Sequence, residues 1–261
     1  MGDELFSVEG QVVVVSGGSR GIGRALAEGF AERQAQVIIT GRQADTLART
    51  AEEISTGEHP VAFRVCDVSR PEEIDGLVDS VAGEFDHLDG LLNVAGVNKR
   101  RRVEEFDLDE YDWIMDTNLR GAFALAQKVG RHMIGRGSGS IINIDSFNTY
   151  APLVGVAPYA ISKAGLQMMT RSLASEWGKH DVRVNGIAPG FFPTDLAKEL
   201  WAQEEMASWV QKQTPLGRLG KVKELIGAAI FLASPAATFV TGHTLRVDGG
   251  MSAGINWPIQ L

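Results

Sequence analysis

The sequence predicts an α/β protein in which helices cover both faces of a parallel β-sheet. Short apolar segments typical of strands alternate with longer helical segments along the whole 261-residue chain. The first strand segment, Val12–Ser16, is an almost unbroken run of valines, as expected for a strand buried on both faces. A chain of this length fits one large α/β domain better than two small ones, so we expect a single domain over residues 1–261.

The strand segments are short apolar runs, and they are predicted at Val12–Ser16, Val37–Thr40, Val61–Cys66, Leu88–Val94, Ile141–Asp145, Val182–Ala188 and Thr244–Val247. The helices between them are predicted to begin near Gly21, Ala44, Pro71, Asp109, Tyr159 and Val222. Ser69-Arg70-Pro71-Glu72 has the capping-box pattern, so we expect the Ser69 side chain to cap the third helix.

Composition and charge argue against several classes of function. The net charge of −8 disfavours nucleic acid or an anionic membrane as the main partner. The longest apolar stretch, Leu225 to Ala233, has the length of a core helix and not of a membrane span. The N-terminus is acidic and lacks the pattern of a signal peptide, so we expect a cytoplasmic protein. Cys66 is the only cysteine and is expected to be buried, and the scattered histidines predict no catalytic metal.

Tyr159 and Lys163 stand four residues apart, and Ser146 lies upstream of them. On a helix, this spacing places the lysine ammonium beside the phenol. A free phenol titrates near pH ~10, and a nearby cation favours the phenolate and brings the pKa toward the working range of an acid or base. Tyr-x-x-x-Lys occurs often, and alone it would more often be an ordinary surface pair, but together with the motifs below it predicts the active site of an oxidoreductase.

A glycine-rich turn, Ser16-Gly17-Gly18-Ser19-Arg20-Gly21-Ile22-Gly23, follows the valine strand directly and leads into an amphipathic helix. Glycines allow the backbone to approach a pyrophosphate, and a helix N-terminus presents free N–H groups to it. A lone glycine pattern would fit a plain tight turn equally well. The order of strand, turn and helix favours a dinucleotide site.

Together these residues resemble the short-chain dehydrogenase/reductase family over almost the whole chain. The glycine turn is similar to the family's Thr-Gly-x-x-x-Gly-x-Gly motif, with Ser16 in place of threonine. Leu92-Asn93-Val94-Ala95-Gly96 is similar to its Asn-Asn-Ala-Gly motif, with Val94 in place of the second asparagine. The resemblance implies a Rossmann-type, doubly wound sheet of seven strands in the order 3-2-1-4-5-6-7. It also implies hydride transfer between a nicotinamide and a carbonyl or secondary alcohol.

The resemblance also assigns roles to individual residues. The residues that match the catalytic tetrad are Asn118, Ser146, Tyr159 and Lys163. Those that match cofactor-binding positions are Gly17, Ser19, Arg20, Gly21, Ile22, Gly23, Arg42, Asp67, Val68, Asn93, Ala95, Gly96, Tyr159, Lys163, Pro189, Gly190 and Thr194.

In the implied mechanism, Tyr159 gives a proton to the carbonyl oxygen and Ser146 hydrogen-bonds that oxygen. Lys163 lowers the pKa of Tyr159 and holds the nicotinamide ribose, and Asn118 binds a water that links Lys163 to solvent. Asp145, directly before Ser146, is unusual at that position. The sequence leaves open whether its carboxylate faces the other side of the sheet or the nicotinamide region.

The second strand predicts a preference for NADP over NAD. Relatives that use NAD have an acidic residue at the end of this strand, and Gly41 stands at the expected place. Arg42 and Arg20 would pair with a 2′-phosphate, although both arginines could also be solvated.

The loop after Gly96 predicts the substrate class. Lys99 and Arg100 resemble paired basic residues in members of the family that act on gluconate and deoxygluconate, and either cation would bind a substrate carboxylate. We therefore expect a sugar acid as substrate, with Lys99, Arg100, Ser146 and Tyr159 in contact with it. The alternative is a 3-oxoacyl-acyl-carrier-protein reductase, and a non-enzymatic NADP sensor is disfavoured because it would not need the tetrad.

Residues 191–215 interrupt the alternation of strands and helices and are rich in aromatic residues. Members of the family have a substrate-covering lobe at this position. The alternative is a pair of surface helices whose aromatic residues pack in the core. The resemblance further implies a homotetramer that associates through Gly121–Met133, Leu166–Trp177 and the segment 247–251.

Overall fold

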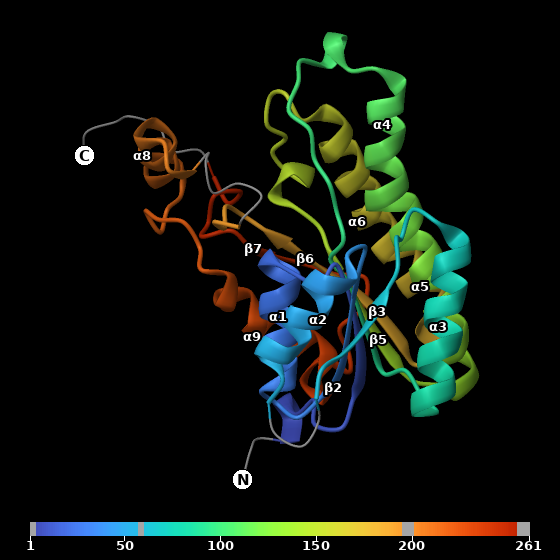
Figure 1. The fold of residues 1–261 in the computed structure, drawn as a ribbon. Helices are drawn as coiled ribbons and strands as arrows, with labels where there is room; N and C mark the ends of the chain where they lie inside the picture. The colour runs from blue at the N-terminus through green and yellow to red at the C-terminus, as the bar shows by residue number, and fades with distance from the viewer. Residues whose placement is uncertain (1–3, 57–59, 195–200, 255–261) are drawn as a thin grey trace.

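The structure, a computed structural model, describes residues 4–56, 60–194 and 201–254, which form a parallel sheet between two layers of helices (Figure 1). The sheet has seven strands in the order β3-β2-β1-β4-β5-β6-β7. Every neighbouring pair is parallel. The predicted fold class and strand order are confirmed.

The strands are β1 (Val12–Ser16), β2 (Gln36–Gly41), β3 (Ala62–Val65), β4 (Gly90–Asn93), β5 (Gly139–Ile144), β6 (Val182–Pro189) and β7 (Thr244–Val247). The labelled helices are α1 (Gly21–Ala31), α2 (Ala44–Ile54), α3 (Pro71–Phe85), α4 (Leu108–Met115), α5 (Gly121–Arg136), α6 (Ala157–Trp177), α8 (Glu204–Gln213) and α9 (Ile226–Ala233). A π-helical turn at Asp116–Arg120 joins α4 to α5 without a break.

The strand β1 is buried on both faces, as its valine run predicts. Val13 and Val15 of β1 pack into one apolar cluster with residues of α1, α2 and α9. Val12 and Val14 point the opposite way, into a second cluster with residues of α3, α5 and α6. Because side chains alternate along a strand, a strand with a helix layer on each side must be apolar at every position.

Asn93 at the end of β4 holds neighbouring elements together. Its Nδ2 donates to Asn143 Oδ1 of β5 at 2.9 Å and to the Ala122 carbonyl of α5 at 3.3 Å. Asn143 Nδ2 donates in turn to Thr170 Oγ1 of α6 at 2.8 Å. This buried amide chain ties β4 to β5, α5 and α6, although valine stands at position 94 where the family has a second asparagine.

The predicted capping box at α3 is wrong. The helix begins at Pro71, so its N-cap is Arg70, which makes no side-chain cap. The Ser69 hydroxyl donates instead to Asp67 Oδ1 at 2.8 Å, and Glu73 accepts from the Asp67 N–H at 2.8 Å. The serine lies one residue too early and has a carboxylate partner within reach.

Two other expectations concern membrane-spanning helices and the burial of Cys66. Among the residues described, no helix is long and apolar enough to cross a membrane. Cys66 is buried, as expected, and burial raises the pKa of its thiol to about 12, which keeps it protonated.

Candidate active site

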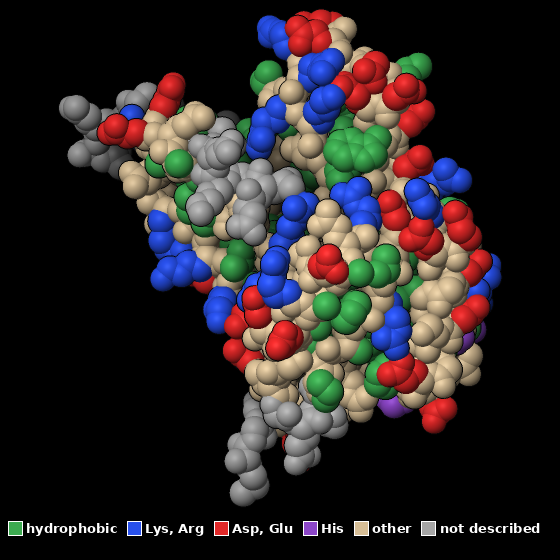
Figure 2. Space-filling model, viewed as in Figure 1, with side chains coloured by type: hydrophobic (Ala, Val, Ile, Leu, Met, Phe, Trp, Pro, Cys, Tyr) green, Lys and Arg blue, Asp and Glu red, His purple; other side chains and the backbone are tan. Residues whose placement is uncertain are grey.

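A cavity of about 980 Å³ opens beyond the carboxyl ends of the central strands. The strand order reverses between β1 and β4, and ligands of open α/β sheets bind at such a switch point. The cavity is lined by the glycine turn, the segments after β4 and β5, the start of α6, and described parts of the 189–212 segment. Figure 2 shows Lys and Arg side chains next to a hollow to the left of α4.

The glycine turn is fitted closely to the strands around it. The N–H groups of Gly17 and Gly18 donate to the Thr40 carbonyl at 2.9 and 3.1 Å. Gly17 has φ +75°, and a Cβ there would lie 2.8 Å from the Ala95 backbone, so a side chain is excluded. Gly23 is equally constrained, because its Cβ would lie 2.2 Å from the Gly17 carbonyl.

The N-terminus of α1 opens into the same cavity. Its N-cap residue, Arg20, makes no side-chain cap, so the first-turn N–H groups are not satisfied by that side chain. Ser19, Arg20, Gly21 and Ile22 line the cavity wall. A helix N-terminus of this kind binds phosphate, and the turn therefore fits the pyrophosphate of a dinucleotide.

The end of β2 fits an adenosine that carries a 2′-phosphate. Gly41 and Arg42 line the cavity, and Arg42 is exposed at its edge. Asp67 lines it from the neighbouring strand. Burial opposes ionisation of Asp67, but hydrogen bonds from Ser69 and the charges of Arg42 and Arg70 hold the pKa of this carboxyl below its ordinary value. Asp67 is therefore a charged hydrogen-bond acceptor at this end.

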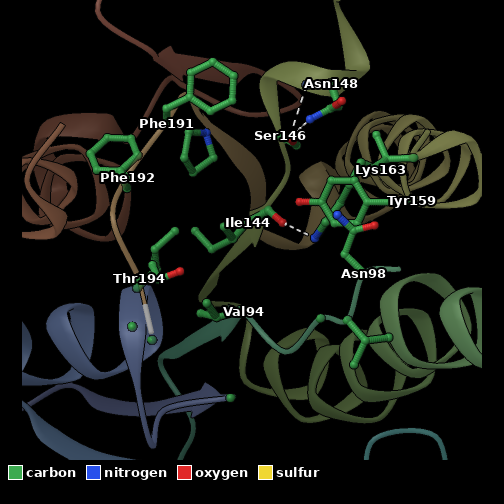
Figure 3. A pocket seen from close by; sticks show the side chains of 18 of the residues that line it. Val94, Asn98, Ile144, Ser146, Asn148, Tyr159, Lys163, Phe191, Phe192 and Thr194 are labelled. Atoms are coloured by element: carbon green, nitrogen blue, oxygen red, sulfur yellow. Dashed lines mark hydrogen bonds between the residues drawn. The ribbon is translucent and has the colours of Figure 1, made fainter. Parts of the chain in front are cut away.

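Three members of the predicted tetrad converge at the other end (Figure 3). Lys163 Nζ donates to the Ile144 carbonyl at 2.7 Å and lies 5.8 Å from the centroid of the Tyr159 ring. Ser146 lies two residues after β5 and lowers the pKa of Tyr159, which lines the same end of the cavity. The helix α6 thus presents both Tyr159 and Lys163 to the end of β5, as the four-residue spacing predicts.

Asn118 lies in the π-helical turn, and its side chain does not line the cavity. Nδ2 donates to the Val97 carbonyl at 2.9 Å and to Ser162 Oγ at 3.0 Å, and Oδ1 accepts from the Val97 N–H at 2.7 Å. These bonds occupy the side chain. A water that links Lys163 to solvent would therefore have to use the Asn118 backbone, where a π-helical turn can leave a carbonyl free.

Most of the predicted binding residues line the cavity, and three predicted site residues do not: Asn93, Lys99 and Asn118. Asn93 is occupied between strands, as described above. Lys99 pairs with Glu110 of α4, which also accepts from Arg101 at 3.1 Å. Arg102 pairs with Glu104. Arg100 lines the cavity and has no ion pair with any residue that the structure describes.

An aromatic wall faces the tetrad across the cavity. Phe191 packs edge-on against Phe147 with ring centroids 4.8 Å apart, against Trp201 at 5.0 Å and against Trp209 at 5.6 Å. The predicted lobe therefore contributes aromatic residues to the site, although residues 195–200 of it lie outside the described part. The aromatic content of residues 191–215 pointed to this segment, but the sequence gave no signal for Phe147.

Comparisons with known proteins agree with this geometry. A family model described as Enoyl-(Acyl carrier protein) reductase matches residues 7–252. The gluconate 5-dehydrogenase of Gluconobacter oxydans is 39% identical over 97% of this chain and 98% of its own length. The 5-keto-D-gluconate 5-reductase of Escherichia coli is 36% identical over 97% of this chain and 100% of its own length. The chain belongs to the short-chain dehydrogenase/reductase family.

The solved structures of the family give the same result. A gluconate 5-dehydrogenase from Burkholderia cenocepacia, in complex with NADP and tartrate, superposes with a TM-score of 0.93 at 37% identity. The match covers 97% of this chain and 99% of that one. As a member of the short-chain dehydrogenase/reductase family, the protein is an oxidoreductase that acts on CH–OH groups.

Electrostatics at the tetrad differ from the sequence-based expectation. Burial raises the pKa of Tyr159 above its ordinary value, and the hydrogen bond from Ser146 only partly offsets this. Burial lowers the pKa of Lys163 to about 8. The expected lowering of the Tyr159 pKa by Lys163 is therefore wrong, because burial and the charge of Asp145 raise this pKa and Lys163 is not among the groups that lower it. A phenol with a raised pKa keeps its proton at neutral pH, which suits a proton donor in carbonyl reduction.

The sequence left open which way the Asp145 carboxylate faces, and in the structure it faces the cavity. Its side chain is buried and lines the cavity, and Oδ1 accepts from Thr149 Oγ1 at 2.7 Å. Oδ2 is buried without a hydrogen-bond partner among the described residues. Burial raises the pKa of this carboxyl to about 6, although the charge of Lys163 and the bond from Thr149 favour the ionised form.

Replacement of Tyr159 by phenylalanine is expected to lower kcat by about 10²–10⁴-fold, because the ring keeps its packing but loses the only proton donor at the carbonyl. Cofactor affinity is expected to change little, since Lys163 is still present. Steady-state kinetics and a cofactor titration of Tyr159→Phe measure both. Retention of most of the turnover would show that the assigned proton donor is wrong.

Asp145→Asn is expected to remove a pH-dependent destabilisation. A carboxyl whose pKa is raised by folding is protonated more readily in the native state, so stability falls as pH rises from about 4 to the folded pKa of about 6. Above that range the full penalty is about 2–3 kcal/mol. Denaturant unfolding at pH 4.5 and pH 7 should show the advantage of the variant growing with pH. A difference between the two proteins that is the same at both pH values contradicts this.

Proposed function

We propose that the protein is an NADP(H)-dependent oxidoreductase whose substrate is a sugar acid of the gluconate and keto-gluconate type. The observation that carries the substrate class is the position of Arg100. Among Lys99, Arg100, Arg101 and Arg102, only Arg100 lines the cavity that holds Ser146, Tyr159 and Lys163, while both its neighbours bind Glu110. Arginine binds a carboxylate with two parallel hydrogen bonds, which fits the acid group of such a substrate.

The names of the relatives support this proposal. The Gluconobacter relative is a gluconate 5-dehydrogenase, the Escherichia coli relative reduces 5-keto-D-gluconate, and the Burkholderia structure holds NADP. Arg20 and Arg42 supply cations where a 2′-phosphate would lie, and Gly41 presents no carboxylate there. These features support NADP as the preferred cofactor.

The chain's own residues account for the acid–base chemistry. A bound nicotinamide would supply or accept the hydride. Tyr159 would hold the proton that goes to the carbonyl oxygen, and its raised pKa keeps that proton in place. The Ser146 hydroxyl would donate to the same oxygen and stabilise the charge that develops on it. Lys163 would hold the ribose hydroxyls, and in the oxidative direction Tyr159 would take the proton back.

The aromatic wall favours a second candidate. Phe147, Phe191 and Trp209 offer an apolar surface that would suit the acyl chain of a 3-oxoacyl thioester. The 3-oxoacyl-acyl-carrier-protein reductase of Vibrio cholerae is 38% identical over 94% of this chain. Aromatic faces also bind the C–H faces of sugars, so the wall does not exclude the first candidate. A substrate panel separates the two.

The remaining expectations stand as proposals. We place the enzyme in the cytoplasm and assign the 191–215 segment as a substrate-covering lobe of a single-domain chain.

We also propose a homotetramer, and apolar residues exposed on α5 and α6 support it. Phe123 of α5 is 44% exposed and Met168 of α6 is 55% exposed, whereas the other sides of both helices pack on the sheet. A monomeric mass in light scattering at micromolar concentration would refute the tetramer.

The cofactor proposal predicts a higher kcat/KM with NADPH than with NADH. Arg42→Ala is expected to lower the NADPH value by about 10-fold or more, because a charged hydrogen bond to phosphate contributes about 1.5–3 kcal/mol. The NADH value should change little. Arg49→Ala is a matched control, since Arg49 is exposed on α2 and does not line the cavity. A wild-type preference for NADH overturns this proposal.

The substrate proposal predicts reduction of 5-ketogluconate or 2-ketogluconate in preference to neutral ketoses and an acetoacetyl thioester. Arg100→Ala is expected to raise KM for the acids by about tenfold, since the arginine is exposed at the rim and its charge is partly screened. Neutral ketones should be unaffected. Arg102→Ala, which removes a cation paired with Glu104 outside the cavity, serves as control. Equal use of neutral ketones and acids, or an unchanged KM in Arg100→Ala, refutes the sugar-acid assignment.

A further inference from the structure

Asn148 binds the catalytic serine at two points. It lies in the short 3₁₀ turn Phe147–Thr149 that follows Ser146, and it is buried. Its backbone N–H donates to Ser146 Oγ at 3.1 Å, and its side-chain Nδ2 donates to the same oxygen at 3.2 Å. Figure 3 shows the amide directed at the serine. Position 148 was not among the residues predicted from the sequence.

The orientation of the Asn148 amide is fixed by a third bond. The Leu153 N–H donates to Asn148 Oδ1 at 3.0 Å. A backbone N–H can only donate, so the end of the amide that faces it must be the oxygen. The other end, which faces Ser146, is therefore the NH₂ group.

These bonds decide what the Ser146 hydroxyl can do. A serine hydroxyl has one proton to donate and two lone pairs that accept. Both accepting positions of Ser146 are filled by N–H groups of Asn148. Ser146 also favours the ionised form of the Tyr159 phenol and lowers its pKa. With its lone pairs occupied, the serine can act toward that oxygen only as a donor. If Tyr159 donated its proton to Ser146, that proton would not be directed at the reacting oxygen. Because Asn148 fills both accepting positions of the serine, Tyr159 cannot donate to it.

We propose that Asn148 is a positioning residue that commits Ser146 to the donor role, so that the serine proton is directed at the reacting oxygen and the Tyr159 proton stays available for transfer. This inference rests on the proposed carbonyl reduction. Acceptance of two N–H bonds also polarises the serine O–H and strengthens the bond that it donates.

Two substitutions at Asn148 distinguish this role from a structural one because they predict opposite rankings. Asn148→Asp keeps the acceptor for the Leu153 N–H but presents an acceptor to Ser146, so the serine proton turns toward position 148. Asn148→Ala loses the bond to Leu153, but leaves the serine one backbone donor and a proton free to point at the substrate. The positioning role predicts that Asn148→Asp loses about tenfold or more kcat beyond the loss in Asn148→Ala, with KM changed less. A structural role predicts that Asn148→Ala is the more damaged variant.

The same pair in a Ser146→Ala background removes the effect of the added charge. A negative charge at position 148 acts on Tyr159 whether or not the serine is present, whereas misdirection of the serine proton requires the serine. The extra loss in Asn148→Asp should therefore largely disappear in Ser146→Ala. An equal loss in both backgrounds, or greater damage in Asn148→Ala, overturns the proposal.

A substrate-free measurement separates this inference from the proposed function. Ultraviolet titration of tyrosine, taken as the difference from Tyr159→Phe, isolates one of the three tyrosines. Asn148→Asp should raise the pKa of Tyr159 more in the wild-type background than in Ser146→Ala, because only there is a serine donor lost. An equal rise in both refutes the positioning role. If the wild-type protein reduces none of the panel ketones, the proposed function fails and the titration still decides the role of Asn148.

Discussion

The hydrogen bond from Lys163 to the Ile144 carbonyl is the interaction on which the active site depends. It joins the N-terminal half of α6 to Ile144, the last residue of β5. Asp145 and Ser146 follow directly in the chain. A buried ammonium group is costly unless it is hydrogen-bonded, so this contact is strongly favoured over alternatives. Once it forms, Tyr159 is brought to the same strand end one helical turn away.

Burial at this point also sets the acid–base properties of the site. The protein interior disfavours charge, so desolvation moves Tyr159, Lys163 and Asp145 toward their neutral forms. Hydrogen bonds from Ser146 and Thr149 oppose that trend without cancelling it. The glycine turn at the other end of the cavity has the opposite character, with arginines and backbone N–H groups at its wall. The chemistry of one end of the cavity thus suits the binding of anions, and that of the other end suits the movement of protons.

The fold and the placement of Tyr159 beside Lys163 could be predicted from the sequence because both depend on short-range patterns. An all-apolar strand such as Val12–Ser16 has to be buried on two faces, and the spacing of Tyr159 and Lys163 fixes one helix face. Lys99 was predicted to contact the substrate, but it pairs with Glu110 of α4 and does not line the cavity. That partner lies eleven residues away in the sequence, and the sequence does not show that the two side chains meet. The pKa of Tyr159 was misjudged because charge proximity is visible in a sequence, whereas the depth of burial is not. Asn148 was missed because its bond to Ser146 exists only when the chain turns into a 3₁₀ helix directly after the strand.

The double hydrogen bond between Asn118 and Val97 acts as an anchor for the loop that follows. Both the N–H and the carbonyl of Val97 are held, so the chain leaves this point in a fixed place and direction. Arg100 comes three residues later, and an extended chain advances at most ~3.6 Å per residue. The tether confines its Cα to within about 11 Å of the anchor, whatever shape the loop takes. Loop motion can therefore change the angle and distance at which the guanidinium meets a ligand, but only within the reach of this short tether.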